Sequence, residues 1–251
     1  MLASANSLAI RYAPVVLFAL LWEIVTRTGA VSPRLLPPVS SILVEGARLF
    51  AGNDIYHHAA VSLMRAFSGL GIAIVFGVTV GILMARLSIV RVILNPIVQM
   101  FYPLPKSALI PVMIIWLGIG SASKVTLIFI GCMVPVIIST FNGARGVDEI
   151  LIWSARSLGA SERAILREVI LPAAMPQILS GVRIALATCF LLLVSSELLI
   201  SNDGLGYYIG ILGENGSYPT MFAVIFIVIA IGFSADRLYL QVMNRMIAWA
   251  Q

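Results

Sequence analysis

Long apolar stretches alternate with short polar segments along the whole chain. A helix that crosses a bilayer needs about 20 mostly apolar residues. Four stretches meet this requirement, and with their flanking residues they predict spans over about 62–86, 124–145, 173–200 and 216–244. The span 173–200 contains two charged residues, Arg183 and Glu197, whereas the apolar centres of the other three contain none. This pattern predicts an all-α membrane protein.

Two further spans are less regular. Residues 12–28 begin as an apolar run like that of a signal sequence, but Glu23 and Arg27 follow where a small-residue cleavage site would stand. A retained first helix is therefore predicted. Residues 92–118 are also apolar, but prolines interrupt them, and a proline lacks an N–H donor and clashes with the preceding turn. The prolines are Pro96, Pro103, Pro105 and Pro111. We expect one broken span here, which brings the total to about six.

Two shorter patterns refine this picture. Residues 39–50, VSSILVEGARLF, mix polar and apolar positions and are too short to span, which favours a helix lying at the membrane surface. Within the span 62–86, small residues recur at every fourth position from Gly69 to Ala85. That spacing places them on one helix face, where another helix can approach closely.

A polar segment, residues 147–171, separates two of the apolar spans. Asp148 can cap the start of a short helix, and Gly159 can end it because glycine adopts positive φ without strain. Ser161 can cap a second short helix that is expected to end before or at Pro172. Two short amphipathic helices joined by a bend would form a compact knob with an apolar side. That side could pack on the chain's own helices or on a partner.

Composition supports a membrane location and excludes several functions. The chain is 60% hydrophobic and only 11% charged, well below the charged content of about 25% that is usual in water-soluble domains. The net charge is +5, but the sequence has no cluster in which basic and aromatic residues alternate, as nucleic-acid-binding proteins have. No nucleic acid is therefore expected as a partner. Cys132 and Cys189 lie inside apolar segments, where cysteine behaves as a small hydrophobic residue, so neither a disulfide nor a metal site is expected.

Positive residues in short loops tend to stay in the cytoplasm. With six spans and both termini in the cytoplasm, eight arginines fall on the inner side: Arg11, Arg86, Arg91, Arg145, Arg156, Arg163, Arg167 and Arg245. The outer side then carries six positive residues: Arg27, Arg34, Arg48, Arg65, Lys106 and Lys124. The modest excess predicts that both termini and the segment 147–171 are cytoplasmic.

The polar segment also carries a family signature. Its residues SARSLGAS…ILREVILPAAMPQIL resemble the cytoplasmic motif of permease subunits in bacterial ATP-binding-cassette importers. That motif runs Glu-Ala-Ala, three residues, Gly, and then an aliphatic residue and Pro about a dozen positions later. Gly159 and Leu171-Pro172 match it, whereas Trp153 and Ser154 replace its glutamate and first alanine. Two other blocks, PLPKSALIPVMIIWLGIGSASK and SSELLISNDGLGY, resemble the branch that handles nitrate, taurine and alkanesulfonates.

The resemblance implies a fold and a set of partners. It predicts the architecture of a type I importer permease, with residues 1–251 as a single transmembrane domain and a cytoplasmic coupling helix. The chain contains no GxxxxGK[ST] phosphate loop, so it is not expected to be an enzyme or to bind a cofactor itself. ATP and Mg²⁺ would bind a separate ATPase subunit. A second permease copy, an extracytoplasmic binding protein and the lipid bilayer of the bacterial inner membrane are the other expected partners.

In that family the cytoplasmic knob sits in a groove of the ATPase. The resemblance therefore implies eight candidate coupling residues: Trp153, Ser154, Ala155, Leu158, Gly159, Ala160, Ile165 and Pro172. No catalytic residue is expected.

The translocation path is harder to place in the sequence. Charged groups in spans usually face the bundle interior or water, and broken helices expose backbone to a cavity. On these grounds the candidates are Met100, Phe101, Tyr102, Arg183, Ser195, Ser196 and Glu197. The alternatives are core packing for residues 100–102, a hydrogen bond from the NDGLGY turn to Glu197, and an Arg183 side chain that reaches the headgroups.

Two other classes of membrane protein would show different sequence patterns. A secondary transporter driven by an ion gradient generally shows internal repeats and intramembrane acidic relays, and a membrane-embedded enzyme would show a catalytic cluster such as HExxH. Neither pattern is evident in the sequence. The sequence therefore favours the permease of an ATP-driven importer for a small anionic or organic solute, with the secondary transporter as the alternative.

Overall fold

The structure is a computed structural model of the 251-residue chain. It describes the backbone of residues 2–32 and 35–250 and the side chains of residues 13–32 and 35–249. The side chain of Arg11 and all of Arg34, which entered the predicted charge distribution, lie outside this described part. Every regular element in the described part is helical.

The helices are long in the body of the molecule and short at its two ends. In chain order, the α-helices are α1 (Leu2–Arg27), α2 (Val39–Ala51), α3 (Asp54–Arg86), α4 (Ser88–Phe101), α5 (Ile110–Leu117), α6 (Ser121–Arg145), α7 (Glu149–Ser157), α8 (Glu162–Ala164), α9 (Leu171–Leu199), α10 (Leu205–Glu214) and α11 (Tyr218–Met246). Two 3₁₀ turns, η1 (Lys106–Leu109) and η3 (Ala248–Ala250), and one π-helical turn, η2 (Ile165–Ile170), complete the elements.

Four helical segments in the described residues are long and apolar enough to cross a membrane: α3, α6, the run from α8 to α9, and α11. A bent pair, α4 with η1 and α5, makes a possible fifth, because its halves meet at 93°. The predicted broken span, residues 92–118, falls on this bent pair. The break lies at residues 102–105, so Pro96 stays inside α4 and Pro111 falls in the first turn of α5. The predicted first span lies in α1, much of whose side-chain content is outside the described part.

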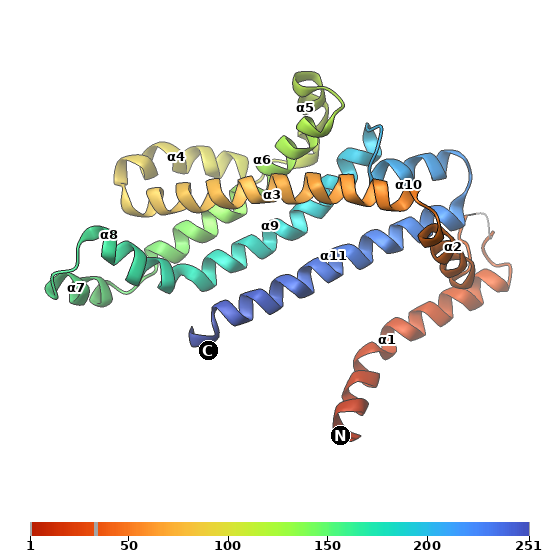
Figure 1. Cartoon of the computed structure of the whole chain (residues 1–251), viewed down its shortest axis with the longest axis horizontal. Coiled ribbons are helices and arrows are strands. Elements are labelled where there is room, and N and C mark those ends of the chain that lie inside the picture. Colours follow the sequence, from red (N-terminus) through yellow and green to blue (C-terminus); the bar gives the residue numbers. More distant parts are fainter. Residues whose placement is uncertain (1, 33–34, 251) are drawn as a thin grey trace.

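The long helices form one bundle. In Figure 1, α3, α6, α9 and α11 run side by side along the long axis, with α7 and α8 at one end and α10 at the other. The main apolar core lies between α3, α5, α6 and α9, and it includes Ala73, Ile128, Cys132 and Ala185, which are all inaccessible to solvent. α1 diverges from the bundle and contacts it near α2 and α11, where Trp22 packs edge-on against Phe222.

The closest helix contact uses the predicted stripe of small residues. A Cβ atom added at Gly77 of α3 would lie 2.8 Å from Cβ of Val136 on α6. No real side chain tolerates that distance, so the two backbones can approach this closely only because the residue is glycine. The prediction of an intimate helix contact along the face from Gly69 to Ala85 is confirmed.

The second short helix of the polar segment is not a separate element, contrary to the prediction. The chain continues as one helical rod from Glu162 to Leu199 and passes through Pro172 and Pro176. The physical reason is local. Pro172 falls in the first turn of α9, directly after the π-helical turn η2, and a π turn already departs from the i→i−4 hydrogen bonding that a proline would interrupt.

Candidate functional site

The bend of the polar segment is built as its residues predict. The Oδ1 atom of Asp148 accepts a hydrogen bond from the N–H of Ile150 at 2.9 Å and caps α7. α7 ends at Ser157, and Gly159, two residues later, has φ +85°. The next residue, Ala160, donates its N–H to the carbonyl of Ala155 at 3.1 Å. This is the hydrogen bond of a Schellman cap, which requires a left-handed residue at the position of the glycine.

Several apolar side chains of this segment are turned outward. Leu158 is 86% exposed and Trp153 is 59% exposed, and Ile150 on α7 is similarly open. Large apolar side chains exposed together indicate a surface that binds something else. Among the other candidate coupling residues, Ser154 and Gly159 are exposed, whereas Ala155, Ala160 and Pro172 are half-buried.

Ile165 requires a correction. It was expected in the docking surface, but its side chain is fully buried and packs with Ala144, Ile170 and Ala174. The cause is the continuous rod, which turns this face of η2 towards the end of α6 and the start of α9. Ile165 therefore holds the segment onto the bundle and has no surface to offer a partner in this structure.

A carboxylate ties the bend to the bundle. The two oxygens of Glu162 accept hydrogen bonds from Arg156 of α7 and from Arg86 at the end of α3, both at 2.6 Å. The three side chains are partly exposed, so each ion pair adds little stability. Their geometric effect is more specific, because one residue joins α7 to the end of the long helix α3.

The candidate path residues fall in three separate environments. Met100 and Tyr102, at the end of α4, are exposed, and Phe101 is somewhat less so. Arg183 on α9 forms a two-bonded ion pair with Asp236 on α11, at 2.8 and 3.1 Å, rather than reaching for headgroups. The third group, Ser195, Ser196 and Glu197, lies near the end of α9.

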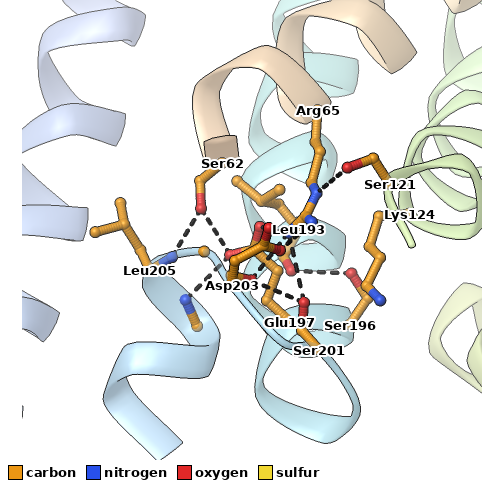
Figure 2. A network of polar contacts seen from close by, with 12 residues as sticks. Ser62, Arg65, Ser121, Lys124, Leu193, Ser196, Glu197, Ser201, Asp203 and Leu205 are labelled. Carbon is orange, nitrogen blue, oxygen red and sulfur yellow. Dashed lines mark hydrogen bonds and ion pairs between the residues drawn. The ribbon is translucent and has the colours of Figure 1, made fainter. Parts of the chain in front are cut away.

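The third group belongs to a buried polar network at the end of the bundle opposite α7. Glu197 is completely buried and Ser196 nearly so, while Ser195 is half-buried. Figure 2 shows the centre of the network, where Arg65 of α3 donates to Glu197 Oε1 at 2.9 Å. Arg65 also pairs with Asp203 and donates through Nε to Ser121 Oγ at 2.9 Å. The guanidinium therefore joins α3, α6, α9 and the turn after α9.

The remaining oxygen of Glu197 is also bonded. Oε2 accepts from Ser62 Oγ at 2.7 Å and from the N–H of Gly206 at 3.1 Å (Figure 2). The bond from Gly206 is the predicted hydrogen bond to the NDGLGY turn. The turn has no spare room, because a Cβ added at Gly204 would clash with the carboxyl group of Glu197. Glu197 is thus enclosed by the protein and does not face a path in this structure.

Sequence reasoning missed most of this network. It singled out Glu197 but not Arg65, Asp203 or Lys124, although Lys124 is buried beside the network and donates to the carbonyl of Ile119. A signal was present, since Arg65 and Lys124 each stand directly at the edge of an apolar span. Charged residues at such positions are rare and usually paired. In the described part of the chain, no group of acidic, His or Cys side chains could hold a metal ion.

Comparison with known proteins identifies the family. Residues 73–248 match the family described as the binding-protein-dependent transport system inner membrane component. The chain belongs to this family. The permease is 36% identical to the taurine transport system permease protein TauC of Escherichia coli (strain K12) over 233 aligned residues. The alignment covers 91% of this chain and 85% of TauC.

Other relatives and solved structures agree with this assignment. The permease is 34% identical to a Bacillus subtilis (strain 168) protein that carries the name aliphatic sulfonates transport permease protein SsuC, over 94% of this chain and 85% of that protein. Its fold resembles inward-facing conformations of the MetNI methionine ABC transporter, with a TM-score of 0.60 and 21% identity over 74% of this chain and 93% of that one. A second structure, an amino acid ABC transporter, gives a TM-score of 0.58 at 17% identity, over 74% of this chain and 89% of that one.

These findings settle the broad function. The chain is a multi-pass inner-membrane permease of an ATP-binding-cassette importer, with the all-helical fold of type I permeases. Nothing in the comparisons favours a transporter driven by an ion gradient.

Proposed function

We propose that this permease forms, with a second copy of itself, the path for taurine or a related small sulfonate, and that α7 and its bend dock a separate ATPase. An extracytoplasmic binding protein delivers the solute, as the family description implies. Two relatives carry names of taurine and sulfonate permeases, which supports this substrate class. ATP and Mg²⁺ bind the ATPase and not this chain.

One observation carries the docking proposal. Leu158 is the most exposed large apolar side chain of the bend, at 86%, and Trp153 lies on the preceding helix at 59%. α7 and the turn that follows it stand at one end of the molecule (Figure 1), beyond the ends of the long helices, where the lipid tails of a bilayer spanned by the bundle do not reach. An apolar surface in that position requires a protein partner.

The rigid parts of the segment explain how motion would pass to the bundle. α8, η2 and α9 form one rod, so a force on the bend acts directly on a helix that spans the bundle. Glu162 joins the same bend to the end of α3 through Arg86. With the bend in the cytoplasm, closure of the ATPase dimer on ATP would tilt α9 and α3 together.

A second copy is supported by the unpaired face of α4. In the described structure α4 has no buried residue, and Ile89, Val92 and Met100 are each more than 70% exposed. Part of this face meets lipid, and part is available to another permease copy around a shared path.

The docking proposal is tested by Leu158→Asp, with Leu35→Asp as the matched control. Both leucines are exposed in short connections. Leu158 follows α7 and Leu35 precedes α2, and α7 and α2 lie at opposite ends of the molecule (Figure 1). We expect Leu158→Asp to abolish co-purification of the ATPase and reduce taurine uptake at least tenfold, because a desolvated carboxylate without a partner costs several kcal/mol. Leu35→Asp should retain both properties. Normal co-purification and uptake by Leu158→Asp would refute the docking surface.

A further inference from the structure

A groove of about 400 Å³ lies between α4 and α6, in the half of the molecule nearest to the bend. The groove lies close to the bend because Asn142, one of its lining residues, stands one turn before the end of α6, and α7 begins soon afterwards at Glu149. The walls combine polar and apolar groups. Its principal lining residues are Asn95, Gln99 and Tyr102 of α4 and Ile138, Phe141 and Asn142 of α6.

The polar residues of the groove come from both of its helices. Asn95 and Gln99 are four residues apart and Tyr102 follows three later, so one face of α4 carries all three. Asn142 of α6 lines the same groove. Within the part of the chain that the structure describes, the side-chain amides of Asn95, Gln99 and Asn142 have no hydrogen-bond partner.

Unpaired amides are costly in the interior of a membrane. Leaving one without a hydrogen bond in hydrocarbon costs several kcal/mol, so polar side chains inside spans face water, a ligand or another protein group. Three amides in one groove are therefore typical of a face of α4 and α6 that meets water, a ligand or another protein group rather than lipid.

The charges around the groove indicate which solutes it suits. Arg91 lies one turn before Asn95 on α4, and the guanidinium of Arg145 lies 5.8 Å from the centre of the Phe141 ring, so both stand at the end nearest the bend. Neither arginine forms an ion pair in the described part of the chain. No acidic residue lines the groove. Amide N–H donors, a positive mouth and apolar walls together fit a short organic anion.

We infer that this groove is the solute-binding segment of the path on the side of the bend, and that its amides bind the oxyanion group of a small organic acid such as a sulfonate. The inference rests on the proposed function, because it takes this permease to carry such a solute. The amides of Gln99 and Asn142 donate to the oxyanion oxygens, and Ile138 and Phe141 contact its carbon chain.

The first test measures taurine uptake by the complete transporter in proteoliposomes. Gln99→Leu removes one donor from the groove, and a lost hydrogen bond to a charged group raises the transport KM about tenfold. Gln241→Leu is the matched control, because Gln241 is an exposed amide on α11 that lies outside the groove. It should keep the wild-type KM. A wild-type KM in both Gln99→Leu and Asn142→Leu would overturn the inference.

A second test does not depend on the solute. The only two native cysteines, Cys132 and Cys189, are buried, so a Gln99→Cys variant can be probed in the assembled complex with a charged, membrane-impermeant thiosulfonate. We expect labelling in inside-out vesicles. Absence of labelling would place Gln99 against lipid or inside a dry interface and would overturn the inference. If the wild-type complex imports no sulfonate, the proposed substrate class fails, and the labelling result alone decides whether the groove is open to water.

Discussion

The ion pair between Arg65 and Glu197 shows how single residues fix this fold. Both side chains are almost completely buried, and a buried charge is tolerated only when a partner and additional hydrogen bonds replace the lost water. Each group here has such partners, because Ser121 and Asp203 bind the guanidinium while Ser62 and Gly206 bind the carboxylate. The network therefore holds the ends of three helices and a turn in one arrangement.

Replacement of Arg65 should strongly lower the stability of the folded protein. Arg65→Met leaves Glu197 buried without its cation, and breaking a buried pair on one side costs about 3–5 kcal/mol. We expect a clearly lowered midpoint of thermal unfolding for the purified permease in detergent. The matched control is Arg48→Met, since Arg48 pairs with Glu45 at the surface, where an ion pair is worth about 0–1 kcal/mol. Equal midpoints for the two variants would contradict the structural role of the network.

Residue-level predictions succeeded where the interaction is local. Asp148, Gly159 and Ser161 act within three residues of their own positions, so their roles as caps could be read from the sequence. Arg65 and Glu197 are 132 positions apart, and no single-sequence pattern pairs such residues. The same limit applies to Ile165, whose burial depends on how η2 is turned against α6.

At the scale of helices, the contact between α3 and α6 dominates the packing of the bundle. Its small residues could be predicted as a face because four-residue spacing is a property of one helix. The partner of that face could not be predicted, since any other span could have met it. The short helix α10 was also missed, because Leu205–Glu214 lies between two predicted spans and is itself apolar.

Two glycines of α3 allow a controlled test of its contact with α6, because Gly77 lies in that contact and Gly71 lies outside it. Gly77→Ala places a Cβ 2.8 Å from Val136, and overpacking of this kind costs about 1–3 kcal/mol. Gly71→Ala adds the same atom where nothing lies within 4 Å. We expect Gly77→Ala to lower the thermal midpoint and Gly71→Ala to leave it unchanged or raise it. The contact would be wrongly placed if Gly71→Ala were the more damaging change.

At the scale of the whole molecule, the single chain has exposed apolar surfaces that suit partners. Apolar side chains are exposed on α4 and on α7, which lie in different surroundings if the bundle crosses a membrane. Long apolar stretches and the family signature were enough to predict the class of protein. How this chain would pair with the proposed second copy is not encoded in any local pattern, because it depends on surfaces that are exposed in the single chain.

The most direct test of this account asks on which side of the membrane the bend lies. Leu158 and Leu35 are both exposed, and they adjoin α7 and α2, which lie at opposite ends of the molecule (Figure 1). Each is replaced by cysteine in turn, as Leu158→Cys and Leu35→Cys. In intact cells, an impermeant maleimide should label Leu35→Cys and spare Leu158→Cys, and in inside-out vesicles the preference should reverse. Labelling of Leu158→Cys from outside the cell would place the bend away from any cytoplasmic ATPase and would contradict the coupling role of α7.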